Sequence, residues 1–342
     1  QAMIPSPKAA AAGTLSEHPV GAGPFAFDEY RKEQLLSLRR YAGYWDAPAY
    51  RLGGIDFVNS SADLNASLSS LFGGSFDLLG ISQAQADAVK RQSGFSVFKQ
   101  PSEDTYYFLA ICNTTPPFDK AKFRQALQFA INRDELNQIA TGGTGVIAYM
   151  GWPKGSQYYV PSIAKRWRYD PKRARQLLKQ AGVAKGTSFK FISPIGADLD
   201  RLAEVIKAQL AKVDLDVHVQ LSMNIPVDLY ENNGAPMTIS LNVFPGVERL
   251  LRRFAPDSAG NWCHHNDATI NTLLNKIAAG PKDAAEAKAL WTRVQKLVAD
   301  YGAPIFLFFS SLLAAHSDKV VGLKHIYASG QGFDFAGVGV TR

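Results

Sequence analysis

The chain has few cysteines and no long apolar run. With 342 residues it exceeds the usual size of a single hydrophobic core, so two lobes are expected. Its two cysteines, Cys112 and Cys263, are too few for a disulfide scaffold. Two alternatives stay open: one bridge that ties a strand of the first lobe to the second lobe, or two buried thiols. No apolar run approaches the roughly 20 residues that span a bilayer.

The chain also lacks the motifs of common catalytic and nucleotide sites. It contains no Gly-x-Ser-x-Gly or His-Glu-x-x-His sequence, and its glycine clusters do not lie between a strand and a helix, as phosphate loops do. Cys263, His264, His265 and Asp267 are metal-ligand types, but adjacent histidines share no face of a helix or strand. A polar loop is favoured there. We therefore expect no enzyme, no cofactor and no metal site.

Charge does not indicate a nucleic-acid partner. The net charge is +7 and the sequence pI is near 9.2, which raises that alternative. However, the lysines and arginines are dispersed over predicted helix faces, and the densest groups, at 165–168 and 249–253, are short. We expect no nucleic-acid partner, whereas a basic cleft that prefers an anionic ligand stays open.

The most informative stretch runs from Thr105 to Ile139. Its first seven residues are mostly β-branched or aromatic and are apolar on both faces, which predicts a buried central strand. Pro116 and Pro117 end that strand, because proline offers no N–H to a ladder. Apolar residues then recur at helical spacing, which predicts an amphipathic helix capped by Asp119, and Asn132 is expected to cap a second helix.

This stretch, TYYFLAICNTTPPFDKAKFRQALQFAINRDELNQI, resembles the signature of the family 5 extracellular solute-binding proteins, the oligopeptide-, dipeptide- and nickel-binding components of ABC importers. The segment that ends in Tyr44-Trp45 and the helix that begins at Asp170-Pro171 match family elements too. The resemblance covers roughly Pro19 to Val321. It implies an α/β, two-lobed periplasmic-binding-protein-like fold of the class II type, with mixed sheets flanked by helices.

Periodicity favours the same fold class. Residues 54–99 read as strand, helix, strand, helix and strand, which is a βαβ pattern. Asp170 and Pro171 begin a helix that Gly182 should end. Residues 215–221 alternate strictly, so their odd-numbered side chains are expected to face the core: Leu215, Val217, Val219 and Leu221.

The predicted domain organisation has two lobes and two crossings. We expect an incoming segment at 1–18, lobe 1 at 19–115, lobe 2 at 116–315 and a return to lobe 1 at 316–342. The strand at 105–111 would then belong to lobe 1. Family members usually begin well upstream, so the chain is expected to lack their N-terminal portion, as a fragment or a reduced form. That missing portion is one expected partner.

Candidate ligand-binding residues come from strand ends and loops expected at the cleft between the lobes. They combine aromatic faces with a few polar groups, as small-molecule clefts do: Glu103, Asp104, Tyr106, Asn113, Tyr149, Trp152, Asn242, Phe244, Glu248 and Trp262. For Tyr149 and Trp152, which lie in an aromatic-rich loop, simple coverage of that loop is an equal alternative.

The resemblance also bears on the ligand. In peptide-binding relatives an aspartate after a strand of the second lobe pairs with the ligand's ammonium group. Residues 241–248 contain no aspartate, and Glu248 is the one substitute. A buried ammonium without a carboxylate is costly, so an anionic or apolar ligand fits this region better than a peptide bound in the usual way.

The resemblance implies a substrate-binding protein of an ABC importer. Such a protein captures a small peptide or peptide-like ligand and delivers it to permease subunits in the membrane. It acts outside the cytoplasm, in the periplasm or as a cell-surface lipoprotein, and no signal sequence is recognisable in this chain. Two alternatives stay open: a non-transport ligand-binding or sensing protein on the same scaffold, and, less favoured, an enzyme recruited from it.

Overall fold

The chain forms two compact units. The computed structural model describes residues 5–32, 34–59, 64–100, 105–196, 198–231, 234–243, 254, 261, 263, 265–311, 313–324, 327–328 and 332–341. Unit 1 comprises Gln1–Ser102 and Leu312–Arg342, and unit 2 comprises Glu103–Ser311. None of the helices in this described part of the chain is long and apolar enough to cross a membrane.

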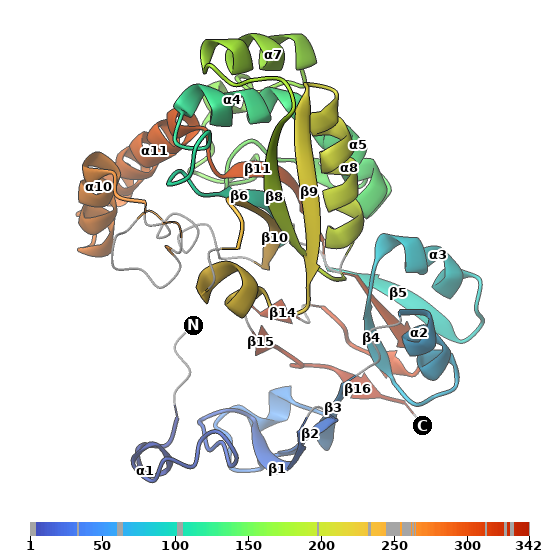
Figure 1. Ribbon diagram of the computed structural model, residues 1–342. Coiled ribbons are helices and arrows are strands. Elements are labelled where there is room, and N and C mark those ends of the chain that lie inside the picture. Colours follow the sequence, from blue (N-terminus) through green and yellow to red (C-terminus); the bar gives the residue numbers. More distant parts are fainter. Residues whose placement is uncertain are drawn as a thin grey trace. The chain divides into compact units, whose positions relative to one another are not determined.

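Unit 1 is built from small sheets and short helices (Figure 1). Two three-stranded sheets have the orders β1-β2-β3 and β4-β12-β5, and two further pairs are β13-β16 and β14-β15. The elements are α1 (Pro7–Ala11), β1 (Phe25–Arg31), β2 (Leu35–Arg40), η1 (Ala47–Ala49), β3 (Gly54–Val58), α2 (Leu64–Phe72), β4 (Leu78–Ile81), α3 (Gln83–Lys90), β5 (Phe95–Lys99), β12 (Leu313–Ser317), β13 (Val320–Val321), β14 (Tyr327–Ala328), β15 (Gly332–Phe333) and β16 (Gly339–Val340).

Unit 2 is built around one six-stranded sheet of order β7-β11-β6-β10-β8-β9. Its elements are β6 (Thr105–Ile111), α4 (Ala121–Ala130), α5 (Arg133–Thr141), β7 (Val146–Ile147), α6 (Pro161–Ala164), α7 (Pro171–Gln180), β8 (Thr187–Pro194), α8 (Leu199–Ala211), β9 (Leu215–Ser222), the π-helical η2 (Pro226–Glu231), β10 (Met237–Val243), α10 (Ala268–Ala278), α11 (Ala284–Tyr301) and β11 (Ile305–Ser310).

The crossings between the units differ from the predicted ones. The chain enters unit 2 at 102/103 rather than at 115/116, and leaves it at 311/312 rather than at 315/316. The physical reason is strand pairing. The strand β6 lies between β10 and β11 and pairs with both along most of its length, so it belongs to unit 2 and not to the first lobe. It is an interior strand, as its apolar faces predicted.

The two faces of this sheet are covered by different helices. Leu109 and Ile111 of β6 pack in one core cluster with residues of α4, α5, α7 and α8. Tyr106 and Phe108 point to the other face, where they pack with residues of α10 and α11. Figure 1 shows α5 and α8 on one side of the sheet and α10 and α11 on the other. Large apolar side chains on both faces make this the main core of the molecule.

The helix predictions are confirmed in part. Asp170 caps α7 by accepting a hydrogen bond from the Arg173 N–H at 2.9 Å, and Asn132 caps α5. The prediction that Asp119 caps α4 is wrong, because that helix begins one residue later, after Lys120. No side chain caps it; instead the Asp119 carbonyl accepts a hydrogen bond from the Arg124 guanidinium.

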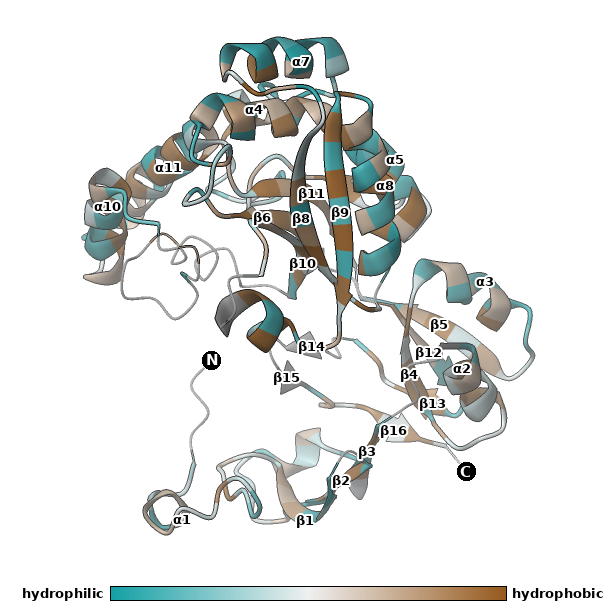
Figure 2. Ribbon diagram, viewed as in Figure 1, coloured by the Kyte–Doolittle hydropathy of each residue, from teal (hydrophilic) through white to brown (hydrophobic). Residues whose placement is uncertain are grey.

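Strand β9 alternates as predicted except at its end (Figure 2). Leu215 and Val217 are buried, whereas Leu221 is 50% exposed. Leu221 lies near the C-terminal end of β9, which is an outermost strand of the sheet. The two cysteines form a disulfide, Cys112–Cys263, which lies entirely within unit 2 and therefore does not join the two units.

Candidate functional site

Most strands of the unit 2 sheet have their C-terminal ends on the same side of the sheet, and we call this side, which runs across the strand ends, the edge of the unit 2 sheet. The strands β8, β9 and β10 are parallel, and β11 runs in the same direction because both β10 and β11 are antiparallel to β6. The C-terminal ends of these four strands therefore meet at the edge where β6 begins. The chain also enters and leaves unit 2 at this edge. In open α/β sheets, ligands bind outside the carboxyl ends of the strands.

Two of the predicted site residues meet at this edge. Asn242 on β10 lies opposite Tyr106 on β6, and the Asn242 Nδ2 donates a hydrogen bond to the Tyr106 hydroxyl at 3.1 Å. Tyr106 is fully buried, and its ring contacts three phenylalanine rings of the same face, Phe108, Phe306 and Phe309. Asn242 is half-buried. This hydrogen bond fixes the amide of Asn242 beside an aromatic wall.

The opposite face of the edge carries a second polar group, which we call the polar corner: Thr105, Tyr107, Asp198 and Ser310. Thr105 and Ser310 are register partners on β6 and β11, so their side chains share a face. Tyr107, two residues along β6, shares that face too. Asp198 precedes α8, which begins at this edge because β8 ends there.

Burial and charge set the electrostatics of the polar corner. Burial raises the pKa of the Tyr107 phenol to about 12, and the negative charge of Asp198 adds to the shift. Burial also raises the pKa of the Asp198 carboxyl, an effect that Arg201 opposes. The Thr105 hydroxyl is buried and has no hydrogen-bond partner in the described structure. Within the described residues, the polar corner therefore holds a hydroxyl without a hydrogen-bond partner and a carboxylate that makes no capping hydrogen bond.

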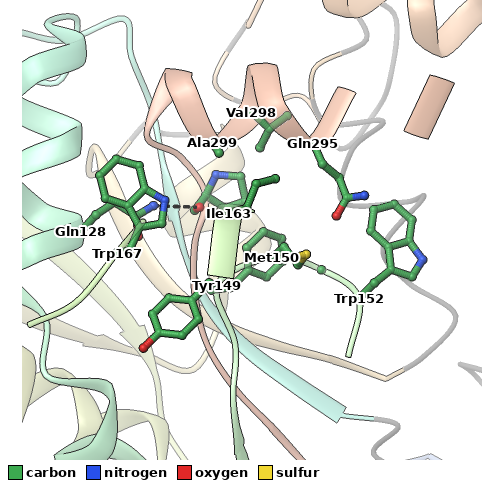
Figure 3. Close-up of a pocket in the computed structure, with 12 residues that line it drawn as sticks. Gln128, Tyr149, Met150, Trp152, Ile163, Trp167, Gln295, Val298 and Ala299 are labelled. Atoms are coloured by element: carbon green, nitrogen blue, oxygen red, sulfur yellow. Dashed lines mark hydrogen bonds between the residues drawn. The ribbon is translucent and has the colours of Figure 1, made fainter. Parts of the chain in front are cut away.

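Tyr149 and Trp152 are not brought to this edge. β7 begins at the edge, and residues 148–152 run away from it. Trp152 is 5% exposed and packs against Trp291, with ring centroids 4.9 Å apart, while Tyr149 lies beneath the buried Arg133 guanidinium. Both line a cavity of about 20 Å³ together with Trp167 and other residues (Figure 3). That volume holds one water molecule and no peptide.

The structure separates Asn113 from the edge as well. Asn113 follows the far end of β6, and a seven-residue strand is about 20 Å long. The remaining predicted residues, Glu103, Asp104, Phe244, Glu248 and Trp262, lie outside the described residues. The basic stretch at 249–253 does so too.

The buried arginines of unit 2 belong to its scaffold. Arg133 is 3% exposed and donates to the Phe306 carbonyl at 2.7 Å and to the Gln128 carbonyl at 3.1 Å. Burial lowers its pKa to about 10. Arg124 similarly donates to backbone carbonyls, including that of Tyr301 at 2.8 Å. Because their donors are used inside the core, these cations are not free to bind an anionic ligand.

Metal ligation finds no support in the described part of the chain. No three His, Cys, Asp or Glu side chains gather there in a way that could hold a metal ion. Cys263, one of the metal-ligand types singled out in the sequence, is engaged in the disulfide.

Comparison with known proteins agrees with the fold. A sequence profile of the family described as "Bacterial extracellular solute-binding proteins, family 5 Middle" matches residues 1–242. The chain is 27% identical over 339 residues to the glutathione-binding protein GsiB of Shigella flexneri serotype 5b, covering 93% of this chain and 64% of that protein. It is 29% identical over 215 residues to di/tripeptide-binding protein 1 of Pseudomonas aeruginosa, covering 61% of this chain and 39% of that protein.

A solved structure gives the same fold. The periplasmic binding protein DppA of Helicobacter pylori, in complex with the peptide STSA, superposes with a TM-score of 0.83 at 21% identity, covering 99% of this chain and 68% of that one. The two-lobed α/β architecture implied by the sequence is thus confirmed. The chain spans just under two thirds of the length of the glutathione-binding relative.

Proposed function

Because the chain belongs to family 5 of the bacterial extracellular solute-binding proteins, we propose that it is the substrate-binding protein of an ABC importer and captures a peptide or peptide-like ligand. The observation that carries this proposal is the sheet edge of unit 2, where parallel strands end beside Asn242 and the polar corner. Relatives with this sequence pattern are binding proteins for glutathione and for di- and tripeptides, which supports the ligand class.

Family members act outside the cytoplasm. We place this protein in the periplasm or on the cell surface as a lipoprotein, with ABC permease subunits as its partners in the membrane. The role is capture and delivery rather than turnover. The half-buried amide of Asn242, which the buried Tyr106 hydroxyl holds in place, suits a binding site, since such sites depend on a small number of fixed polar groups.

Native mass spectrometry of the purified protein tests the proposal. We expect a non-covalent adduct with the mass of a short peptide, which is lost on unfolding and recovered chemically unchanged. Asn242→Ala should reduce the adduct, whereas Asn275→Ala, an exposed position on α10, should retain it. A protein that carries no adduct and takes up neither glutathione nor di- or tripeptides would contradict the proposal.

We also propose that unit 1 binds polypeptide from the part of the family fold that this chain does not span. Unit 1 carries an open groove of about 670 Å³, lined by β3, by most of β4 and by apolar residues such as Val338 and Phe335. Among the described strands, β3 pairs only with β2 and β4 pairs only with β12, so each presents an edge to the groove. An added strand between two sheet edges is a common mode of peptide recognition.

Co-purification tests whether polypeptide from that part of the family fold binds in this groove. The probe is a tagged polypeptide made of the portion of the Shigella flexneri relative outside the matched stretch. We expect it to co-purify with the 342-residue chain and to slow hydrogen exchange in β3 and β4. Ile55→Lys, in the groove, should abolish co-purification, and Tyr30→Lys, on β1, should not. Failure to co-purify with the unchanged chain would count against the proposal.

A further inference from the structure

A second surface of unit 2 is defined by the outer side of α7. This ten-residue helix carries no acid and four cations, which we call the basic face of α7: Lys172, Arg173, Arg175 and Lys179. All four residues are exposed, whereas the opposite side of the helix is buried through Ala174, Leu177 and Leu178. Figure 1 shows α7 next to α4, and Figure 2 shows it as mainly hydrophilic.

The positive charge of the chain is concentrated in the sequence around α7. Between Glu135 and Asp198 the sequence holds ten lysines and arginines and one acid, Asp170. The formal charge of this segment is therefore +9, whereas that of the whole chain is +7, so the rest of the chain is slightly acidic. The carboxylate of Asp170 caps α7. The short basic group at 165–168 thus continues into the basic face of α7.

Neighbouring elements add cations to this surface and do not neutralise it. Among the described residues, no ion pair includes a residue of α7. Arg175 donates to the Lys212 carbonyl at 2.6 Å, and Lys120 donates to the C-cap carbonyl of α7 at 2.9 Å. Asp214, two residues beyond Lys212, is paired with Lys185. Because Lys120 follows the far end of β6 and Lys212 precedes β9, this surface lies opposite the sheet edge.

The charge pattern of α7 opposes helix formation. The N-terminal end of a helix carries a partial positive charge, so cations in the first turn are unfavourable, yet Lys172 and Arg173 lie there and no acid does. Arg175 follows Lys172 by three residues and precedes Lys179 by four, and like charges at these spacings repel each other. A helix that served stability alone would carry acids in its first turn. The basic face of α7 therefore indicates an anionic partner.

We propose that the basic face of α7 binds an anionic lipid surface, and that its cations contact the phosphates of the headgroups. A row of exposed cations along about 15 Å of helix matches an extended layer of phosphates better than one small anion. The apolar side of α7 packs in the core of unit 2, so the helix binds peripherally and does not insert. Tyr169, just before the helix, is 38% exposed and is a residue type enriched at membrane interfaces.

This inference goes beyond the proposed function, because it concerns a surface opposite the ligand edge. It shares with that function only the location outside the cytoplasm, next to the membrane that holds the permease. There the anionic lipid headgroups are always present as a partner. Lipid is therefore favoured over a soluble acidic polypeptide, which the experiment includes as a competing outcome.

Vesicle co-sedimentation of the 342-residue chain, without ligand, tests the inference. The vesicles consist of phosphatidylcholine alone or with about 30% phosphatidylglycerol, which supplies the anionic headgroups. We expect binding to the anionic vesicles at least tenfold tighter than to the neutral ones. Raising the salt from about 0.05 M to about 0.5 M should weaken this binding at least tenfold, because salt screens exposed charges.

Two matched triple variants locate the binding surface. The test variant removes three cations of the basic face: Lys172→Gln, Arg175→Gln and Lys179→Gln. The control removes the same charge from exposed positions of α11: Lys288→Gln, Arg293→Gln and Lys296→Gln. The test variant should bind anionic vesicles at least tenfold more weakly, and the control should stay within about threefold. Thermal unfolding shows whether each variant remains folded, and the test variant should unfold at no lower temperature, because like-charge repulsion is removed.

Three outcomes would overturn the inference. The first is equal binding of the unchanged protein to anionic and neutral vesicles. The second is an equal loss in both triple variants, which would show that net charge and not the basic face of α7 is responsible. The third is binding to soluble poly-glutamate without binding to the vesicles, which would identify an acidic polypeptide as the partner. None of these measurements involves a captured ligand, so the proposed function stands or fails separately, by native mass spectrometry.

Discussion

Removing the Cys112–Cys263 disulfide should lower the stability of unit 2 by about 5 kcal/mol. The two cysteines are 151 residues apart in the sequence. Closing a loop of that length in the unfolded chain removes about 17 cal/mol/K of entropy, which corresponds to about 5 kcal/mol at 25 °C. The perturbation is the double variant Cys112→Ala with Cys263→Ala. Both sulfurs are almost fully buried, so their loss adds a smaller packing term.

Urea unfolding followed by tryptophan fluorescence measures this loss. Four of the five tryptophans lie in the sequence range of unit 2, and Trp45 alone lies in unit 1. A Trp45→Phe background therefore makes the signal report unit 2. The double variant should unfold at lower urea, as should the unchanged protein after reduction. A difference below about 1 kcal/mol between oxidised and disulfide-free protein would refute the reasoning from loop entropy.

Three further predictions concern buried groups. Arg133→Met should lower the free energy of unfolding by about 2–4 kcal/mol, because the carbonyls to which Arg133 donates would lose their donors. The control Arg173→Met, at an exposed position, should lower it by less than about 0.5 kcal/mol. Equal losses would contradict the scaffold role of Arg133. Burial raises the pKa of the Asp198 carboxyl above its value in the unfolded chain, so the charged form opposes folding. The free energy of unfolding should therefore fall as the pH rises from the unfolded pKa through the folded pKa of this group, and in unliganded protein Asp198→Asn should flatten that fall. An unchanged pH profile in the variant would contradict this prediction. Trp167 Nε1 and Gln295 Oε1 are buried without partners and line the cavity of about 20 Å³, so a high-resolution map should show an ordered water there, and an empty cavity would contradict this.

Local sequence patterns predicted individual elements well. The apolar faces of 105–111 predicted a buried strand, and Asp170-Pro171 predicted the start of α7, because both signals depend on residues close in sequence. The crossing between units was not predictable in the same way. An apolar strand must be buried, but its pairing with β10 and β11 joins residues more than 120 positions apart, and periodicity does not report such partners.

The candidate site shows the same limit. Tyr106 and Asn242 could be named because each lies near the end of a predicted strand, and their pairing places them together. Asn113 lies near a strand end too, but at the opposite edge. This could not be predicted, because the sequence does not say which end of β6 lies beside the C-terminal ends of the other strands. Asp198 was not named, because its position at this edge depends on β8 being the parallel neighbour of β10. The signal that could have found it is an acidic residue between a strand and a helix of a βαβ unit.

Hydrogen–deuterium exchange with and without bound peptide tests the central claim most directly. The claim is that the ligand binds at the sheet edge of unit 2. Bound peptide should slow exchange in the segments at 105–107, 195–202 and 241–243, and leave the opposite edge around Asn113 unchanged. Protection confined to the opposite edge, or to unit 1 alone, would contradict the account.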